Sequence, residues 1–315
     1  MKIARALPFI LATAALSACG AGSSSAHSTT AAAAATDVTH LPLGDGHVST
    51  RARRGYVYSC QTRFGTGGAN AATPWIRSDG TWDLTAKPTV AGSVSWPNRR
   101  FALRLGASSL RITGNDLPSH TTGVFPIASS DPAYQYDRNP NSIKATTLNA
   151  SIPRTPRRAA SPSCVPMGPI GVMLTGSVFF NALDAGGRDA AAHELQDRCG
   201  GHPQQQGEYH YHALSPCLYT GKRTVHSRLV GYALDGFGVY GPRGQGGRTL
   251  SNADLDACHG HTHTISWHGR RVRMYHYHAT AEYPYTVGCY RGTPASSSGL
   301  GGGRGGPPGG PPGGR

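Results

Sequence analysis

One motif occurs twice in this chain, and it limits the possible folds more than any other feature. Its first copy reads D-x-C-x-G-H, then YHYHA, then a closing cysteine, over residues 197–217. Its second copy repeats the same order over residues 256–289. Two such copies indicate an internal duplication. We therefore expect two similar halves that face each other.

The histidines of each YHYH are expected on one face of a strand and the tyrosines on the other, because side chains alternate along a strand. If the two copies pair, their imidazoles converge. Imidazole is the commonest protein ligand for zinc and copper, and four nitrogens can satisfy either metal. The pattern predicts one shared site with four ligands and two supporting histidines: His210, His212, His276, His278, His202 and His261. The alternative is a hydrogen-bonded ladder of His and Tyr without metal.

Other chemically active side chains surround the motif. All three glutamates of the chain lie near it, namely Glu194, Glu208 and Glu282. Glu208 and Glu282 are candidate general bases beside a bound cation. Asp235 precedes a glycine between alternating apolar residues, which predicts a hairpin turn, and it either serves that turn or orients a ligand histidine.

Two more groups of histidines lie near the motif. The alternating histidines at residues 259, 261 and 263 could extend the site or bind a metal weakly at the surface. His226 and His268 have no counterpart in the first copy, so we expect them to lie outside the site.

The amino-terminal residues resemble a secretory signal. A basic start and a short apolar run precede small residues and Cys19, and the run is too short to span a membrane. The segment 1–18 therefore predicts a lipoprotein signal peptide, with Cys19 lipidated and the protein held at the cell envelope. An ordinary signal peptide with an unrelated Cys19 is the alternative.

Six cysteines remain if Cys19 carries lipid, and an exported protein oxidises its thiols. Six cysteines allow about 15 pairings. The duplication favours Cys199 with Cys217 and Cys258 with Cys289, which leaves Cys60 with Cys164. Thiolate ligation of a metal is the competing interpretation, but the chain has no C-x-x-C motif.

The chain is basic. It has 30 Lys and Arg against 16 Asp and Glu. Such a charge favours anionic headgroups, polyanions or nucleic acid. We expect no nucleic-acid partner, because no nucleic-acid-binding fold signature accompanies the charge.

Composition divides the chain into four parts. Residues 1–18 form the signal, and residues 19–54, rich in Ala, Ser and Thr, form an expected disordered tether. Residues 55–294 form the domain, with an amino-terminal β part (55–165) and the duplicated part (166–294). Residues 295–315, rich in Gly, Pro and Arg, form a disordered tail.

Short alternating runs separated by turn residues predict a mainly β fold, a compact disulfide-braced sheet or sandwich with little helix. Expected strands include residues 56–59, 90–96, 101–105 and 109–113, and a strand pair is expected over 168–180 with a turn at Thr175 and Gly176. Residues 190–196 are the best short helix. The segments 120–126 and 131–141, the second rich in Asn, Asp and Pro, indicate an ordered loop region, in which His120, Tyr134 and Asn141 could border a site.

The paired YHYH motifs, the stretch GYALDGFGVYG over residues 231–241 and YPYTVGC over 283–289 resemble the YHYH-domain family of exported bacterial proteins. The resemblance extends over roughly His120 to Gly292. It implies export but no established biochemical activity, so it assigns no catalytic residue. The metal prediction therefore rests on residue chemistry alone.

Three functions are consistent with these residues. The first is a cell-envelope lipoprotein that binds copper or zinc through the paired YHYH strands. The second is a metal-dependent envelope enzyme, a hydrolase or oxidase, that uses the same histidines. The third is a structural or adhesive β module without a cofactor.

Overall fold

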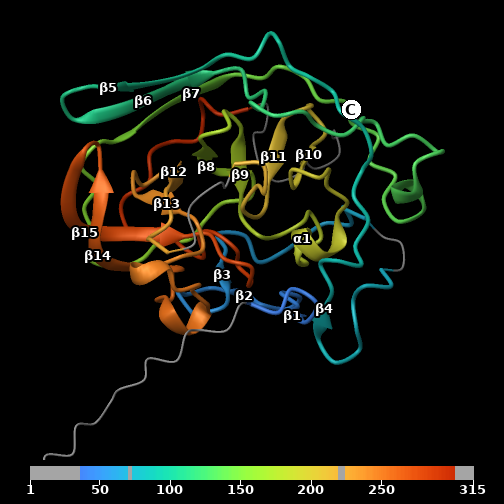
Figure 1. The fold of residues 1–315 in the computed structure, drawn as a ribbon, viewed down its shortest axis with the longest axis horizontal. Helices are drawn as coiled ribbons and strands as arrows, with labels where there is room; N and C mark the ends of the chain where they lie inside the picture. The colour runs from blue at the N-terminus through green and yellow to red at the C-terminus, as the bar shows by residue number, and fades with distance from the viewer. Residues whose placement is uncertain (1–35, 70–72, 219–223, 302–315) are drawn as a thin grey trace, which may run out of the picture. The chain divides into compact units, whose positions relative to one another are not determined.

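An eight-stranded sheet carries both copies of the motif in a computed structural model that describes residues 36–69, 73–218 and 224–301. The predicted signal peptide and Cys19 lie outside these residues. The strand order is β10-β11-β9-β8-β12-β13-β15-β14 (Figure 1). The strands are β8 (Pro169–Met173), β9 (Val178–Phe180), β10 (Gly201–Pro203), β11 (Tyr209–Tyr211), β12 (Leu229–Ala233), β13 (Gly238–Tyr240), β14 (Gly260–Trp267) and β15 (Arg270–His278).

The order is symmetric about the pairing of β8 with β12. Val172 lies opposite Tyr232, with Gly171 opposite Ala233 and Met173 opposite Gly231. In each half, the strand of this central pairing forms a hairpin with the strand that follows it, β8 with β9 and β12 with β13. Each hairpin then pairs in parallel with a YHYH strand, β11 or β15. The predicted duplication is therefore confirmed as two copies of one four-stranded unit related by a pseudo-twofold axis.

The YHYH tyrosines fix each copy to its own half. Tyr209 donates a hydrogen bond to Asp197, and its counterpart Tyr275 donates one to Asp256. All four tyrosine side chains of the two motifs are buried. Because a buried phenol needs a partner, these aspartates explain why an acidic residue begins each copy.

Asp235 serves the hairpin and its neighbours. Its carboxylate accepts hydrogen bonds from Tyr277 Oη at 2.5 Å and from the backbone N–H groups of Phe237, Arg291 and Gly292. The predicted turn is confirmed, because β12 and β13 pair across it. The alternative role, orienting a ligand histidine, is not supported, because all the hydrogen bonds that Asp235 accepts come from this tyrosine and the backbone of the described chain.

Smaller sheets complete the fold. The strands β5 (Phe101–Leu105), β6 (Ser109–Gly114) and β7 (Leu148–Pro153) form an antiparallel sheet, as expected for the first two. Two-residue strands pair as β1 (Leu41–Pro42) with β4 (Thr81–Trp82) and as β2 (Val48–Ser49) with β3 (Val57–Tyr58). The short helices are α1 (Ala190–His193), η1 (Pro132–Gln135), η2 (Gln245–Gly247) and η3 (Asn252–Asp254). The mainly β fold is confirmed.

Some local expectations are wrong. The tether does not reach residue 54, because Leu41 is buried and Asp45 bonds to His193 of α1. The tail does not begin at residue 295, since Leu300 is buried and bridges to Leu148 in β7. Residues 90–96 make only isolated bridges, and the expected helix over 190–196 ends at His193. In each case contacts with distant residues override the local composition.

Three disulfides join the predicted cysteine pairs. The pairs are Cys60 with Cys164, Cys199 with Cys217, and Cys258 with Cys289. The last two occupy equivalent positions in the two copies, which confirms the pairing that the duplication favours. Such bonds fit an extracellular or periplasmic protein. Within the described residues, no helix has the length and apolar character needed to cross a membrane.

One pair of equivalent positions in the two copies has the same unusual backbone conformation. Gly200 has a φ of 79°, and its counterpart His259 has a φ of 71°. Glycine adopts this left-handed region freely, whereas histidine adopts it at a cost. The His259 ring is buried and lies 3.0 Å from Thr280 Oγ1.

We expect the variant His259→Asn to be less sensitive to acid than the wild type. Burial lowers the pKa of His259 from 6.5 to about 3, so the unfolded chain takes up this proton first as the pH falls. Wild-type stability should therefore fall between pH 6.5 and 3, by about 2 to 3 kcal/mol at pH 4.5 from this residue alone. Denaturant unfolding of metal-free protein at pH 7.5 and 4.5 measures the difference. Equal losses in both proteins would contradict the prediction.

Candidate metal sites

The motif histidines form two separate clusters. Site A is defined as Glu194, which precedes the first copy, and His202, His210 and His212 of that copy. Site B is defined as His226, His261, His263, His276 and His278, from the second copy and the segment that precedes it. The ligand atoms of the three site A histidines lie within 4.8 Å of one another, and so do those of the five site B histidines.

The expected single shared site is wrong. β11, which carries His210, and β15, which carries His276, have four strands between them. Neighbouring strands are about 4.8 Å apart, so these two strands are about 24 Å apart across the sheet. The parallel pairing of each YHYH strand with its own hairpin places the two copies at opposite flanks. No single ion can contact both.

The two YHYH histidines of each cluster are held in the same orientation. A backbone carbonyl can only accept a hydrogen bond, so a histidine nitrogen beside one must carry the proton. His212 Nδ1 lies 2.6 Å from the carbonyl oxygen of Asn181, and His278 Nδ1 lies 2.6 Å from that of Gly241, the equivalent position. Backbone carbonyl oxygens also accept hydrogen bonds from the Nδ1 atoms of four other rings, those of His210, His276, His226 and His263. In the neutral rings, Nε2 then has a free lone pair.

These free nitrogens point at one another. The Nε2 atoms of His210 and His212 are 3.1 Å apart, and those of His276 and His278 are also 3.1 Å apart. Two unprotonated nitrogens cannot hydrogen-bond to each other. Ligand nitrogens at about 2.0 Å from a zinc or copper ion would lie about 2.8 to 3.4 Å apart, so the observed spacing matches the edge of a coordination shell.

Burial keeps the rings neutral. Desolvation lowers the pKa of His202, His210 and His278 well below 6.5, and it lowers that of His212 to about 4. Neutral imidazole is the form that binds a metal. The clusters are therefore in their ligating state across the physiological pH range.

Site A adds a carboxylate to its three rings. Glu194 Oε2 lies 3.4 Å from His202 Nε2 and 3.3 Å from His212 Nε2. Within the described part of the chain, neither Glu194 Oε2 nor His202 Nε2 has a hydrogen-bond partner, although both are buried. Such atoms are expensive to bury without a partner. Burial raises the pKa of Glu194 well above its usual value, and a cation between these atoms would lower it again.

Site B adds two rings instead. His261 Nε2 is 3.1 Å from His278 Nε2, and the ring centroids of His226 and His263 are 4.7 Å apart. The buried Nε2 atoms of His226 and His263 lack hydrogen-bond partners among the described residues. The expectation that His226 lies outside the site is wrong, because His226 belongs to the site B cluster. The sequence did not reveal this, since His226 lies in a segment with no counterpart in the motif. His268 is outside both clusters, as expected.

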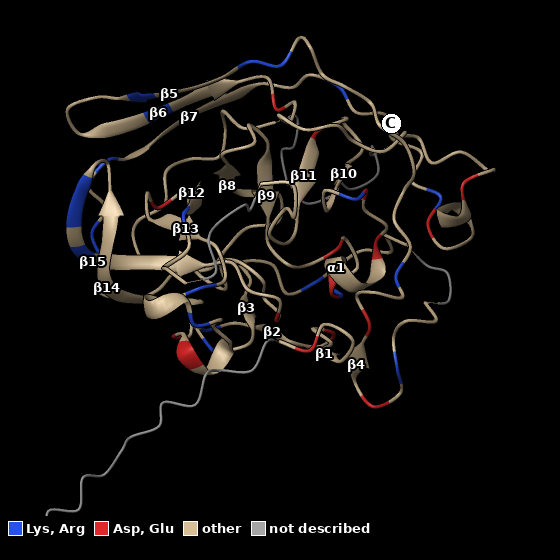
Figure 2. Ribbon diagram, in the orientation of Figure 1, with Lys and Arg blue, Asp and Glu red and all other residues tan. Residues whose placement is uncertain are grey.

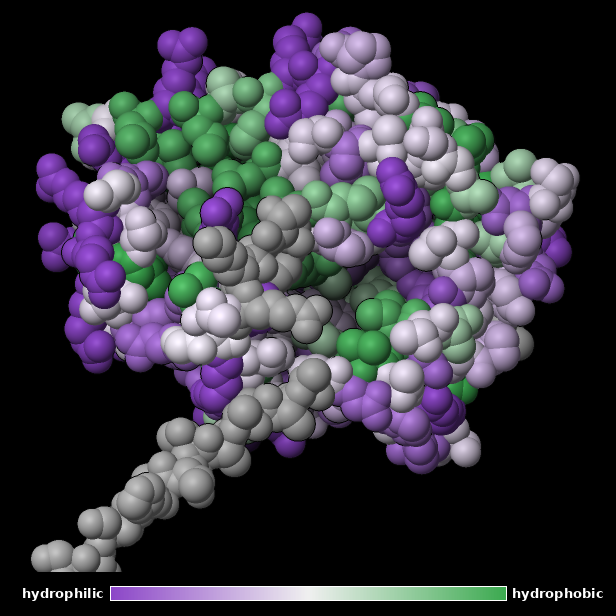
Figure 3. Space-filling model, in the orientation of Figure 1, coloured by the Kyte–Doolittle hydropathy of each residue, from purple (hydrophilic) through white to green (hydrophobic). Residues whose placement is uncertain are grey.

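The charge around site B is positive. The amino-terminal end of β15 carries exposed arginines, seen in blue in Figure 2. The same region forms the hydrophilic left edge of Figure 3. Arg273 lowers the pKa of His263 further, after burial, which is the main cause. Arg273 therefore favours the neutral, metal-binding form of the His263 imidazole over imidazolium.

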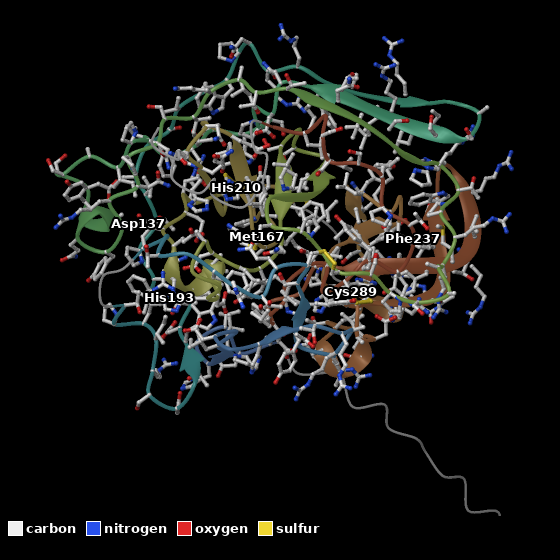
Figure 4. The ribbon with its side chains drawn as sticks, turned by 180° about the vertical axis from the view of Figure 1, so that it is seen from behind. Asp137, Met167, His193, His210, Phe237 and Cys289 are labelled. Carbon is white, nitrogen blue, oxygen red and sulfur yellow. A yellow bond between two sulfur atoms is a disulfide. The ribbon has the colours of Figure 1, made fainter. Side chains whose placement is uncertain are left out.

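A cavity of about 850 Å³ adjoins site A. All four site A residues line it, together with Phe180 and Met167. Figure 4 shows His210, Met167 and Asp137, which reach the cavity from three different segments. Phe180 stacks on His210 with ring centroids 3.9 Å apart, so one wall of the cavity also fixes a ligand ring.

The remaining predicted carboxylates divide between the cavity and the scaffold. Glu208 lies on the same face of β11 as His210 and lines the cavity, and burial raises its pKa to about 7. Glu282 instead accepts a hydrogen bond from the backbone N–H of Asn252, in η3, at 2.7 Å. Of the candidate bases Glu208, Glu282 and Asp235, only Glu208 faces site A. Of the predicted loop residues, Asn141 lines the cavity, whereas His120 bonds to Tyr211 on the opposite face of β11.

A third group of potential ligand atoms is not a metal site. His120 lies near Cys199 and Cys217, but the two sulfur atoms are joined to each other. A disulfide offers no thiolate. The interpretation of the cysteines as metal ligands is therefore wrong for all three pairs.

The fold and the sites define a disulfide-linked β protein with two histidine clusters on one sheet built from two similar halves. Residues 149–249 match the family model described as YHYH protein. The match includes site A and the β12–β13 hairpin but ends before β14, so it is narrower than the resemblance read from the motifs. No curated protein and no solved structure matches the chain.

Proposed function

We propose that this protein is an exported, lipid-anchored protein of the cell envelope that binds copper or zinc at two separate histidine sites. One observation carries the proposal: in both clusters the Nδ1 atoms of the two YHYH histidines donate to backbone carbonyls while their Nε2 atoms converge. The lipid anchor rests on Cys19 and the residues before it. Imidazole and carboxylate ligands suit zinc and copper(II), whereas no Met-rich run is present for copper(I).

The contacts favour metal binding over a histidine and tyrosine ladder without a cofactor. In such a ladder, each imidazole would use both nitrogens in hydrogen bonds or face solvent. Here buried Nε2 atoms approach each other without a proton between them. A cation at each point of convergence would satisfy these atoms together.

The cavity beside site A supports an enzyme as a second candidate. A hydrolase or oxidase needs a metal that a substrate can approach, and Glu208 lines the same cavity as the site A ligands. A carboxylate in that position could accept a proton from a bound water. Among the described residues, no carboxylate belongs to the site B cluster.

We expect the mature protein to bind about two equivalents of zinc or copper(II) per chain. Each cluster has at least three converging nitrogen donors, and the clusters are too far apart to share an ion. The measurement is elemental analysis after removal of metal with a chelator, reloading and desalting. A content near zero would reject the proposal, and one ion per chain would reject its two-site form.

A further inference from the structure

We propose that a metal ion at site A, unlike one at site B, binds an additional small neutral ligand that enters through the adjoining cavity. The ligand would contribute a nitrogen or oxygen donor to the metal and an N–H or O–H group to the cavity wall. This inference rests on the metal binding proposed above, and it assigns different roles to the two copies of the motif.

The two sites differ in the number of protein donors. Site A offers three imidazoles and Glu194, whereas site B offers five imidazoles. Zinc takes four protein ligands in closed sites; where a water or substrate occupies one position, its coordination sometimes expands to five. Five imidazoles already fill that larger number. Four donors leave room for one ligand from outside.

The two sites also differ in access. All four residues of site A line the cavity of about 850 Å³, a volume within the range of small-molecule sites. A second cavity, of about 770 Å³, also includes His212 in its wall. None of the site B histidines lines either of these two cavities in the described part of the chain.

The cavity wall indicates the charge of the ligand. Four carboxylates and one arginine line it: Asp137, Asp184, Glu194, Glu208 and Arg138. An anion would therefore meet four acidic side chains, charged or protonated, and a single arginine, Arg138. Glu208 is fully buried, and its Oε1 atom has no hydrogen-bond partner among the described residues. Because Oε1 lies against Gly301, the hydrogen-bonding role is assigned to the acidic side chains of the wall as a set, which accept from N–H or O–H groups and favour a neutral donor such as an imidazole or an alcohol.

Matched variants separate the two sites for a test. His276→Asn keeps site A, and His210→Asn keeps site B, at equivalent positions of the duplication. Each variant is loaded with copper(II) and desalted, and imidazole is then added while the electron paramagnetic resonance and visible spectra are recorded. If His276→Asn does not fold, the less buried His261→Asn replaces it. Metal content after the titration shows whether imidazole has merely removed copper.

We expect imidazole to change the spectrum of the His276→Asn protein at a concentration at least about tenfold lower than that needed for His210→Asn. Azide, an anion of similar donor strength, should require a higher concentration than imidazole at site A. In the His276→Asn background, Asn141→Trp should narrow the cavity and raise the imidazole requirement about tenfold while the copper content stays the same.

The outcomes distinguish this inference from the proposed function. Failure of both variants to bind copper would overturn the proposed function and the inference with it. Copper bound in both variants, with equal responses to imidazole, would overturn the inference alone. A stronger response to azide than to imidazole at site A would overturn the assigned ligand class.

Discussion

Replacing His210 with alanine is expected to remove one of the two bound metal ions and leave the other in place. His210 contributes one of the converging Nε2 atoms of site A. His276→Ala should remove the other ion, because His276 has the same role in site B. The double variant should retain none.

The two losses should add. Sites about 24 Å apart share no ligands, and distant sites behave independently. At a free metal concentration of about 100 times the dissociation constant, each bound ion should stabilise the protein by about 2.7 kcal/mol. The metal-dependent rise in melting temperature should therefore fall by about half in each single variant and disappear in the double variant.

Elemental analysis and thermal unfolding, with and without a chelator, measure both effects. His40→Ala is a matched control, because the His40 side chain is exposed and its contacts within the described residues are with the neighbouring Asp37 and Thr39. It should bind as much metal as the wild type. Loss of both ions from either single variant would show that the clusters are coupled. Retention of stoichiometric metal by the double variant would exclude these histidines as ligands.

Removing the Cys60–Cys164 disulfide is expected to cost about 4 to 5 kcal/mol of stability. This bond closes the longest loop of the three, with a sequence separation of 104, against 18 for Cys199–Cys217 and 31 for Cys258–Cys289. A long closed loop removes the most conformational freedom from the unfolded chain. The Cys199–Cys217 bond should contribute about 3 kcal/mol.

Paired cysteine-to-alanine variants test this order by denaturant unfolding under metal-free conditions. Metal must be removed with a chelator, because the Cys199–Cys217 bond lies in the copy that carries site A and a bound ion would add its own stabilisation. The equivalent pair Cys258–Cys289 should fall between the other two. A larger loss for Cys199–Cys217 than for Cys60–Cys164 would mean that folded-state contacts, not loop length, dominate the effect.

The sequence alone was sufficient for the repeating parts of the fold. Strand periodicity, the turn residues Asp235 and Gly236, and the order of cysteines in each copy predicted the hairpins and the disulfide pairing. These features depend on local backbone preferences or on the comparison of one copy with the other. Both remain visible without coordinates.

The arrangement of the two copies was not predictable in the same way. Similar motifs show that two halves exist, but pairing between β8 and β12 or between the YHYH strands would preserve the same pattern. The structure chooses the first, so His210 and His276 lie at opposite flanks of the sheet. His226 was missed because it precedes the second copy and matches nothing in the first. The buried Leu41 and Leu300 were missed because their partners are far away in sequence.

The pairing of β8 with β12 has a consequence for proteins with a single copy of this unit. The three residue pairs around Val172 and Tyr232 read the same from either half, as in an isologous contact between identical subunits. A chain carrying only one four-stranded unit would expose that strand as an open edge. Two molecules of it could join there as a homodimer and rebuild the same eight strands, with one histidine cluster contributed by each subunit.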